Sequence, residues 1–124
     1  RIGKVEKAYQ LFLHATRLDL DDYNNEADQG LHITSMPGSW LAIVRGFAGM
    51  QVLKETLCFS PVIPQKWDSY SFKVNYLKNT LHIRVGKEIE ISLTAGSKVD
   101  IQVYGHPYTL ERGTELKINM PMCQ

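Results

Sequence analysis

The period of the apolar residues changes once along the chain, near residues 51 to 60. Before that point they recur three and four positions apart, in the order Val5, Ala8, Leu11, Phe12, Ala15 and Leu18. This spacing is typical of a helix with one buried face. From Ser69 onwards apolar and polar residues alternate, as in YSFKVNYL, which is the pattern of a half-buried strand. The change predicts an α+β chain, in which helices come first and an antiparallel β-structure follows.

Two helices are expected in the first part, over residues 4 to 17 and within SWLAIVRGFAGM, residues 39 to 50. The run DLDDYNNEADQG lies between them and predicts a loop, because Asp and Asn side chains compete with the helical backbone for hydrogen bonds. Loops of this length are often functional. The second helix is apolar around most of its circumference, so we expect neighbours on several sides. Gly46 and Gly49 indicate either close packing or fraying towards its end.

Six short runs in the second part alternate and end at turn residues: YSFKVNYL, TLHIRVG, EIEISLTAG, KVDIQVYG, HPYTLERG and TELKINM. Strands at such regular spacing predict an antiparallel sandwich or barrel. We therefore divide the chain into helical residues 1–56 and a β-sandwich over residues 57–124. The helices resemble the last pair of a larger helical assembly, and alone they would expose apolar surface. Since the helical pattern starts almost at Arg1, without a methionine, we expect the chain to be a piece of a longer protein.

Composition excludes several classes of partner. Lys+Arg number 14 against 13 Asp+Glu, for a net charge of +1, and no basic cluster is present, so a nucleic-acid binder is not expected. No apolar run approaches the roughly 20 residues that span a bilayer, so we expect no membrane partner. Cys58 and Cys123 lie far apart and outside any metal-ligand spacing, which favours free thiols in a reducing compartment.

The stretch GLHITSMPGSW, residues 30 to 40, gathers hydroxyls and a histidine at the expected start of the second helix. Ser35 can cap that helix, and Pro37 suits its first turn. This leaves His32 unexplained. The free amides of a helix start also bind anions, and nearby hydroxyl and imidazole groups add donors. From the residues alone, the stretch is either an ordinary cap or a phosphate site.

The runs LDLDDYNNEADQGLHITSMPGSWLAIVRGFAGM and LCFSPVIPQKWDSYSFKVNY closely resemble the C-terminal end of glycoside hydrolase family 65, above all its maltose-cleaving phosphorylases. The resemblance covers essentially the whole chain, and it is most specific over residues 18 to 50. It implies the terminal helices of an (α/α)6 barrel that holds the active site, followed by a small antiparallel β-sandwich.

The resemblance also implies a reaction, in which inorganic phosphate cleaves maltose with inversion to β-glucose 1-phosphate and glucose, without any cofactor. The family's Gly-x-His-x-x-Ser loop matches Gly30, His32 and Ser35, which implies phosphate binding by His32 and Ser35. Thr34 and Gly38 are weaker neighbours in the same site. Family members often have Gly or Ala where this chain has Pro37, and proline removes one backbone donor.

The general-acid glutamate of the family belongs to a segment that precedes Arg1 in the resemblance. Glu6 and Glu26 lack its motif context, and we interpret them as solvated charges, so this chain holds no catalytic residue and is expected to be inert by itself. The implied partners are the remainder of the same polypeptide, the disaccharide with phosphate, and a second copy in a homodimer. The implied location is the cytoplasm.

Other interpretations stay open. The β part could be a non-catalytic carbohydrate-binding or scaffold module, and some relatives are hydrolases, although a hydrolase wants a carboxylate where HITS stands. No metal is expected, because DLDDYNNEAD departs from the calcium-loop pattern and His14, His82 and His106 are scattered. Trp67 and Tyr70 could stack on a sugar, but we favour packing between the helices and the sandwich.

Overall fold

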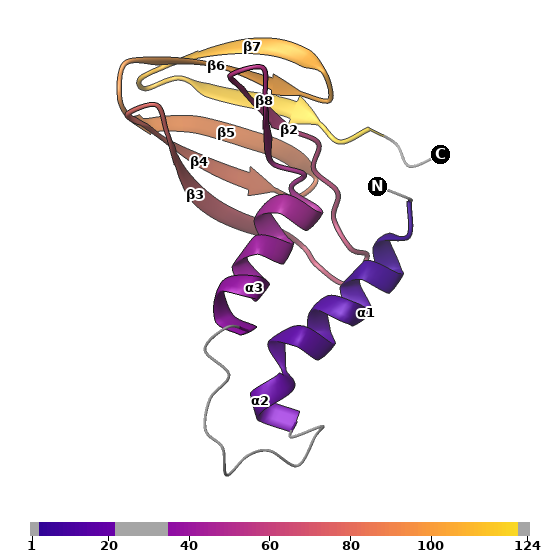
Figure 1. Ribbon diagram of the computed structural model, residues 1–124. Coiled ribbons are helices and arrows are strands. Elements are labelled where there is room, and N and C mark those ends of the chain that lie inside the picture. The colour runs from indigo at the N-terminus through magenta and orange to yellow at the C-terminus, as the bar shows by residue number, and fades with distance from the viewer. Residues whose placement is uncertain (1–2, 22–34, 122–124) are drawn as a thin grey trace.

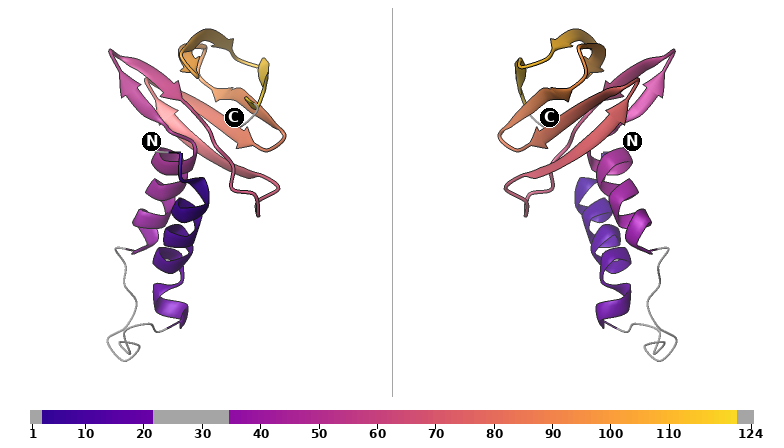
Figure 2. Two further views of the ribbon diagram at one scale, coloured as in Figure 1. Left: turned by 90° about the vertical axis from the view of Figure 1, so that its right-hand side faces the viewer. Right: turned by 90° about the vertical axis from the view of Figure 1, so that its left-hand side faces the viewer.

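The computed structural model describes residues 3–21 and 35–121, and it consists of a pair of helices that extends from one end of a β-sandwich (Figure 1). The helices are α1 (Val5–Thr16), the single turn α2 (Leu18–Asp21) and α3 (Ser35–Leu41), which continues as the π-helical segment η2 (Ala42–Phe47). The α+β class expected from the change of period is confirmed. Both views in Figure 2 show α1 and α3 side by side, and their chain directions are opposite.

The first helix ends where it was expected, but the chain does not turn into a loop at once. Thr16 donates its hydroxyl to the carbonyl of Leu13 at 3.1 Å. Another helical turn, α2, then occupies the start of the predicted loop. The Arg17 guanidinium forms two hydrogen bonds of 2.7 Å with the Asp21 carboxylate four residues later, and such pairs stabilise a helical turn. The loop prediction was therefore wrong for these first residues.

The second helix begins at Ser35, within one residue of the predicted cap, and Pro37 lies in its first turn as expected. Its last six residues are π-helical, so the amide of Ala48 donates to the carbonyl of Ile43, five residues earlier, at 2.8 Å. Gly49 follows with φ of 60°, a left-handed conformation that glycine adopts readily and that ends a helix. The expectation of a helix end near Gly49 is confirmed.

Eight strands form two sheets of four. Their bounds are β1 (Gln51–Leu53), β2 (Thr56–Phe59), β3 (Tyr70–Tyr76), β4 (Asn79–Val85), β5 (Glu88–Ala95), β6 (Lys98–Val103), β7 (His106–Glu111) and β8 (Glu115–Asn119). One sheet has the order β1-β2-β6-β7 and the other the order β3-β4-β5-β8. All six predicted strands are present, whereas β1 and β2 were not predicted.

One strand pair departs from the expected antiparallel arrangement. β2 and β6 run parallel, with Leu57 opposite Ile101 and Phe59 opposite Val103. The chain leaves the first sheet after β2, forms β3 to β5 in the other sheet, and returns as β6. This crossover places two distant strands side by side in the same direction. The sandwich is therefore mixed in one sheet and antiparallel in the other.

A single apolar core fills the space between the two sheets. Its fully buried members come from both of them, with Leu57, Phe59 and Ile101 on one side and Ile83 and Ile91 on the other. The core extends into the helical part through Val44 and Ala48. The amide of Val62 donates to the carbonyl of Phe47 at 2.8 Å. Both the core and this backbone contact attach the end of η2 to the sandwich.

The apolar faces of the helices stay largely uncovered within this chain. In α1 only Tyr9 is buried, and Leu11, in the middle of the apolar stripe, is 61% exposed. On the second helix Met36 is 66% exposed and Trp40 is 47% exposed. The expectation that these helices alone would expose apolar surface is confirmed.

Candidate functional site

Of the predicted phosphate residues, the structure describes Ser35 and Gly38, which lie at the start of α3, the end of that helix farther from the sandwich (Figure 1). Ser35 is the first residue of α3, and Gly38 lies in the same first turn, three residues later. His32 and Thr34 lie outside the described residues, as does Glu26. The first amides of a helix have no partner within it, and they point outwards from its start with the positive end of the helix dipole.

The first turn of α3 offers open space beside its backbone. Gly38 is exposed, and a Cβ added to it would meet no atom within 4 Å. Pro37 is also exposed. It contributes no amide hydrogen, so this turn has one backbone donor fewer than a turn without proline. An anion at this turn can be bound only by the remaining amides and by side chains.

Trp67 joins both helices to the sandwich. Its ring centroid lies 5.8 Å from that of Tyr9 and 5.4 Å from that of Phe12 in α1. It lies 4.9 Å from the ring of Phe47 in η2 and 5.6 Å from that of Tyr70 in β3. These are packing contacts between aromatic rings. The interpretation of Trp67 and Tyr70 as packing residues, rather than a sugar-stacking surface, is confirmed.

Glu6 has a structural contact. Its carboxylate oxygen accepts a hydrogen bond of 3.1 Å from the backbone amide of Gln65, in the segment that leads into β3. This exposed contact fixes the start of α1 to the sandwich. It agrees with the interpretation of Glu6 as a surface charge and refines it by adding a partner.

The outer faces of both sheets are polar. In one sheet Arg84 lies 3.6 Å from Glu90, and Lys117 lies 3.3 Å from Glu115. The hydrogen bond to Glu115, with the negative charge of that residue, raises the pKa of Lys117. On the other sheet the hydroxyl of Thr109 donates to Asp100 at 2.6 Å. These faces are typical of solvated β-structure.

The aromatic side chains of the strands pack inwards. Phe59 and Phe72 are buried in the core, and the partly buried rings that pack against it are Tyr70, Tyr76, Tyr104 and Tyr108. A carbohydrate-binding surface needs an exposed aromatic face on which a sugar ring can stack. Within the described strands neither outer face has one, which disfavours the interpretation of the sandwich as a carbohydrate-binding module.

Among residues 3–21 and 35–121 no three His, Cys, Asp or Glu side chains are grouped to hold a metal ion. In the same ranges no helix is both long enough and apolar enough to cross a membrane. Cys58 is a buried free cysteine, and Cys123 lies outside the described residues.

Comparison with known proteins matches the two parts of the chain to two domains of one family. Residues 1–41 match the glycosyl hydrolase family 65 central catalytic domain. Residues 50–110 match the glycosyl hydrolase family 65 C-terminal domain. The two matched ranges follow one another along the chain in the order helices, then sandwich.

Among curated relatives, maltose phosphorylase of Bacillus subtilis is 47% identical over 107 residues, which are 86% of this chain and 14% of that protein. Alpha,alpha-trehalose phosphorylase of Geobacillus stearothermophilus is 38% identical, over 95% of this chain and 16% of that protein. A solved structure assigned as a kojibiose phosphorylase from the human microbiome superposes with a TM-score of 0.90 at 35% identity, covering 99% of this chain and 18% of that one.

The chain thus spans less than a fifth of the length of these relatives. The predicted phosphate residues are tested neither by the described geometry nor by the comparisons, and they remain a prediction. The matched domains, the identity along almost the whole chain and the shared fold agree with one another: this chain belongs to glycosyl hydrolase family 65, in which it corresponds to the end of the central catalytic domain and the C-terminal domain.

Proposed function

We propose that this chain is the C-terminal part of an inverting disaccharide phosphorylase, and that maltose is the substrate of the whole enzyme. The main support for the proposal is the Gly-x-His-x-x-Ser sequence, which ends at Ser35, the first residue of α3. The amides at the start of that helix are available to bind an anion. The choice of maltose is supported by the 47% identity to a maltose phosphorylase, against 38% to a trehalose phosphorylase and 33% to a kojibiose phosphorylase of Thermoanaerobacter brockii.

In the proposed reaction a glutamate from the rest of the enzyme protonates the glycosidic oxygen, while phosphate attacks the anomeric carbon from the opposite face. The bond from carbon to the leaving oxygen breaks as the bond to phosphate forms, which inverts the centre. Phosphate is already an anion, so it needs positioning rather than deprotonation. His32 and Ser35 donate to it, and Thr34 and Gly38 complete the site.

The remainder of the polypeptide is the proposed partner, in the form of an (α/α)6 barrel that ends with α1 and α3. The match of residues 1–41 to the central catalytic domain supports this. The division at residues 56 and 57, the homodimer and the cytoplasmic location are parts of the same proposal. The free thiol of Cys58 is consistent with a reducing compartment.

The test uses the full-length enzyme with maltose, and it measures β-glucose 1-phosphate while the phosphate concentration is varied. A hydrogen bond to a charged group is worth about 1.5–3 kcal/mol. His32→Ala and Ser35→Ala should therefore each weaken phosphate use by roughly tenfold to a hundredfold, as a raised apparent phosphate KM with a lowered kcat.

Matched controls lie on the outer face of the sandwich, where His82 and Ser92 face each other across β4 and β5. His82→Ala and Ser92→Ala should leave the phosphate kinetics unchanged. If His32→Ala and Ser35→Ala behave like these controls, the assignment of the phosphate site is wrong. If the unmodified enzyme releases no glucose 1-phosphate from maltose but does so from trehalose or kojibiose, only the choice of substrate is wrong.

A further inference from the structure

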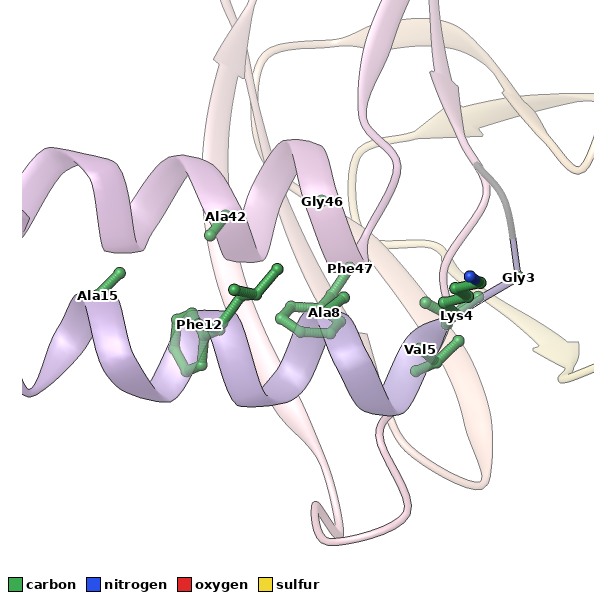
Figure 3. A pocket seen from close by; sticks show the side chains of 11 residues that line it. Gly3, Lys4, Val5, Ala8, Phe12, Ala15, Ala42, Gly46 and Phe47 are labelled. Atoms are coloured by element: carbon green, nitrogen blue, oxygen red, sulfur yellow. The ribbon is translucent and has the colours of Figure 1, made fainter.

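The open surfaces of this chain are of two kinds. One is an apolar groove of about 500 Å³ along the helix pair, towards which Ala15 and Ala42 are directed (Figure 3). The proposed function already gives that groove a partner, namely the remainder of the catalytic domain. The other kind consists of the edge strands of the two sheets, which are β1 and β7 in one sheet and β3 and β8 in the other (Figure 1).

Three of these four edge strands have a feature that opposes pairing with another chain. β1 has only three residues. β7 contains Pro107, which has no amide hydrogen to donate. β3 has one charged residue, Lys73, and no acidic residue in the same strand to match it. Short strands, prolines and lysines are the means by which proteins keep sheet edges from pairing with one another.

β8 lacks such protection. Its sequence is ELKIN, and among the described strands it has β5 on one side and no neighbour on the other. Its lysine, Lys117, differs from Lys73 because an acidic residue lies two positions away in the same strand. The Lys117 ammonium is 3.3 Å from the Glu115 carboxylate, and both side chains are about half exposed. The open edge therefore presents one positive and one negative charge.

The inner face of β8 is incompletely covered. Leu116 and Ile118 pack against the core but stay partly exposed. Their partners in β5, Ile91 and Ile89, are fully buried. A further strand beyond β8 would therefore bury apolar surface of Leu116 and Ile118 as well as pair with the backbone of β8.

We propose that β8 pairs antiparallel with β8 of a second copy of this chain, around a two-fold axis at Leu116. In this register Glu115 lies opposite the partner's Lys117, and Lys117 lies opposite the partner's Glu115. Opposite charges in facing positions stabilise a strand pair, whereas like charges destabilise it. An axis at Lys117 would place two ammonium groups opposite each other. The order of the charges in ELKIN thus selects both the partner and the register.

Such a contact is isologous, because both copies use the same surface. It joins the two sheets that contain β8 into one continuous sheet across the dimer. The contact lies on the sandwich, whereas the proposed phosphate site lies at the end of α3 farther from the sandwich. The inference names an interface for the homodimer that the proposed function includes, and in that respect it rests on the proposed function. It does not depend on which disaccharide the enzyme cleaves.

The experiment reverses the charges in the full-length enzyme and measures the Kd of dimerisation by sedimentation velocity. Glu115→Lys places lysines opposite one another, and Lys117→Glu places glutamates opposite one another. Each variant alone should raise the Kd at least about tenfold, because two attractive pairs become repulsive. Lys73→Glu, on the opposite edge of the same sheet, is the control and should leave the Kd unchanged.

An equimolar mixture of Glu115→Lys and Lys117→Glu should form a heterodimer with a Kd near that of the unmodified enzyme, because every lysine then faces a glutamate. A variant with both substitutions should recover the homodimer for the same reason. A monomeric unmodified enzyme, a Kd that neither single variant changes, or a mixture that does not associate would each overturn the proposal.

Leu116→Cys tests the register. Facing Cα atoms of an antiparallel pair lie about 4.5–5.5 Å apart, which a disulfide can span. With oxidised glutathione Leu116→Cys should therefore give a covalent dimer. Ile118→Cys, which lies opposite the partner's Thr114 in this register, should not. Cross-linking of Ile118→Cys alone, or of neither variant, contradicts the proposed pairing. Glucose 1-phosphate release from maltose is assayed separately on the unmodified enzyme, so failure of the reaction is distinguished from failure of the interface.

Discussion

Replacing Trp67 with alanine should detach the helix pair from the sandwich. The ring of Trp67 contacts Tyr9 and Phe12 on α1, Phe47 on η2 and Tyr70 on β3. Truncation of a buried tryptophan to alanine costs about 3–5 kcal/mol. Trp67 is half-buried rather than buried, so we expect the lower end, about 3 kcal/mol. A domain is stabilised by about 5–15 kcal/mol in all, so this loss is large.

The assay is urea unfolding of the 124-residue chain, followed by circular dichroism. Trp40→Ala is the matched control, because it removes the same side chain from a position that is 47% exposed. We expect Trp40→Ala to cost about 1 kcal/mol, in keeping with an ordinary point substitution. Each variant keeps one tryptophan, so fluorescence of Trp40 in Trp67→Ala reports on the helix pair directly.

The two variants should differ in the order of events as well as in magnitude. In Trp67→Ala the helical signal should be lost at lower urea than the β signal, because the core between the sheets contains no part of Trp67. An equal, small cost for both substitutions would refute the reasoning that Trp67 holds the two parts together. It would also reopen the question of a sugar-stacking role.

Two further predictions concern the sandwich. A Cβ on Gly96, at φ +101°, would lie 2.8 Å from Cγ of Asn79, whereas one on Gly105, at φ +82°, would meet nothing within 4 Å. Gly105→Ala should therefore lower the free energy of unfolding by about 1 kcal/mol, for its backbone conformation alone. Gly96→Ala should lower it by about 3 kcal/mol, because the buried Asn79 must also give up its hydrogen bond to the carbonyl of Leu77. Equal urea midpoints for the two variants would contradict this. In a chain with Cys123→Ser, the buried thiol of Cys58 should react with a disulfide reagent only in denaturing urea, and rapid reaction of the native chain would show that its strand opens.

Periodicity alone was enough to predict the regular elements. The helix expected over residues 4 to 17 is observed as Val5–Thr16, and the run YSFKVNYL contains the strand Tyr70–Tyr76. In these segments one face is buried against a neighbour, so the spacing of the apolar residues follows the period of the helix or strand. The short strands β1 and β2 were missed because three or four residues are too few to establish a period. Pro61 and Pro64, shortly after β2, also argued against strands in this segment.

Features that depend on distant segments could not be predicted in the same way. The parallel pairing of β2 with β6 depends on the path that the chain takes between the two sheets. That path produces no recognisable pattern in the residues of either strand. The Arg17–Asp21 pair spans the helical turn α2 and supports a helical conformation, whereas aspartates alone predict a turn. For the phosphate site, helix-start chemistry favours an ordinary cap and leaves an anion site as the alternative. Only the resemblance to a family motif selected His32 and Ser35, and they remain a prediction.

The sandwich is attached to the helix pair at the end of that pair remote from the proposed phosphate site. Glu6 accepts from Gln65, Phe47 accepts from Val62, and Trp67 packs against both helices. Ser35, at the other end of α3, lies about three turns from Phe47, since these helical residues advance about 1.5 Å each. The sandwich can therefore fix the direction of α3 but cannot contact an anion at its start. Residues that would complete the proposed site must therefore come from the segment between α2 and α3 and from the rest of the catalytic domain, which is why the His32 variant is the experiment that decides most.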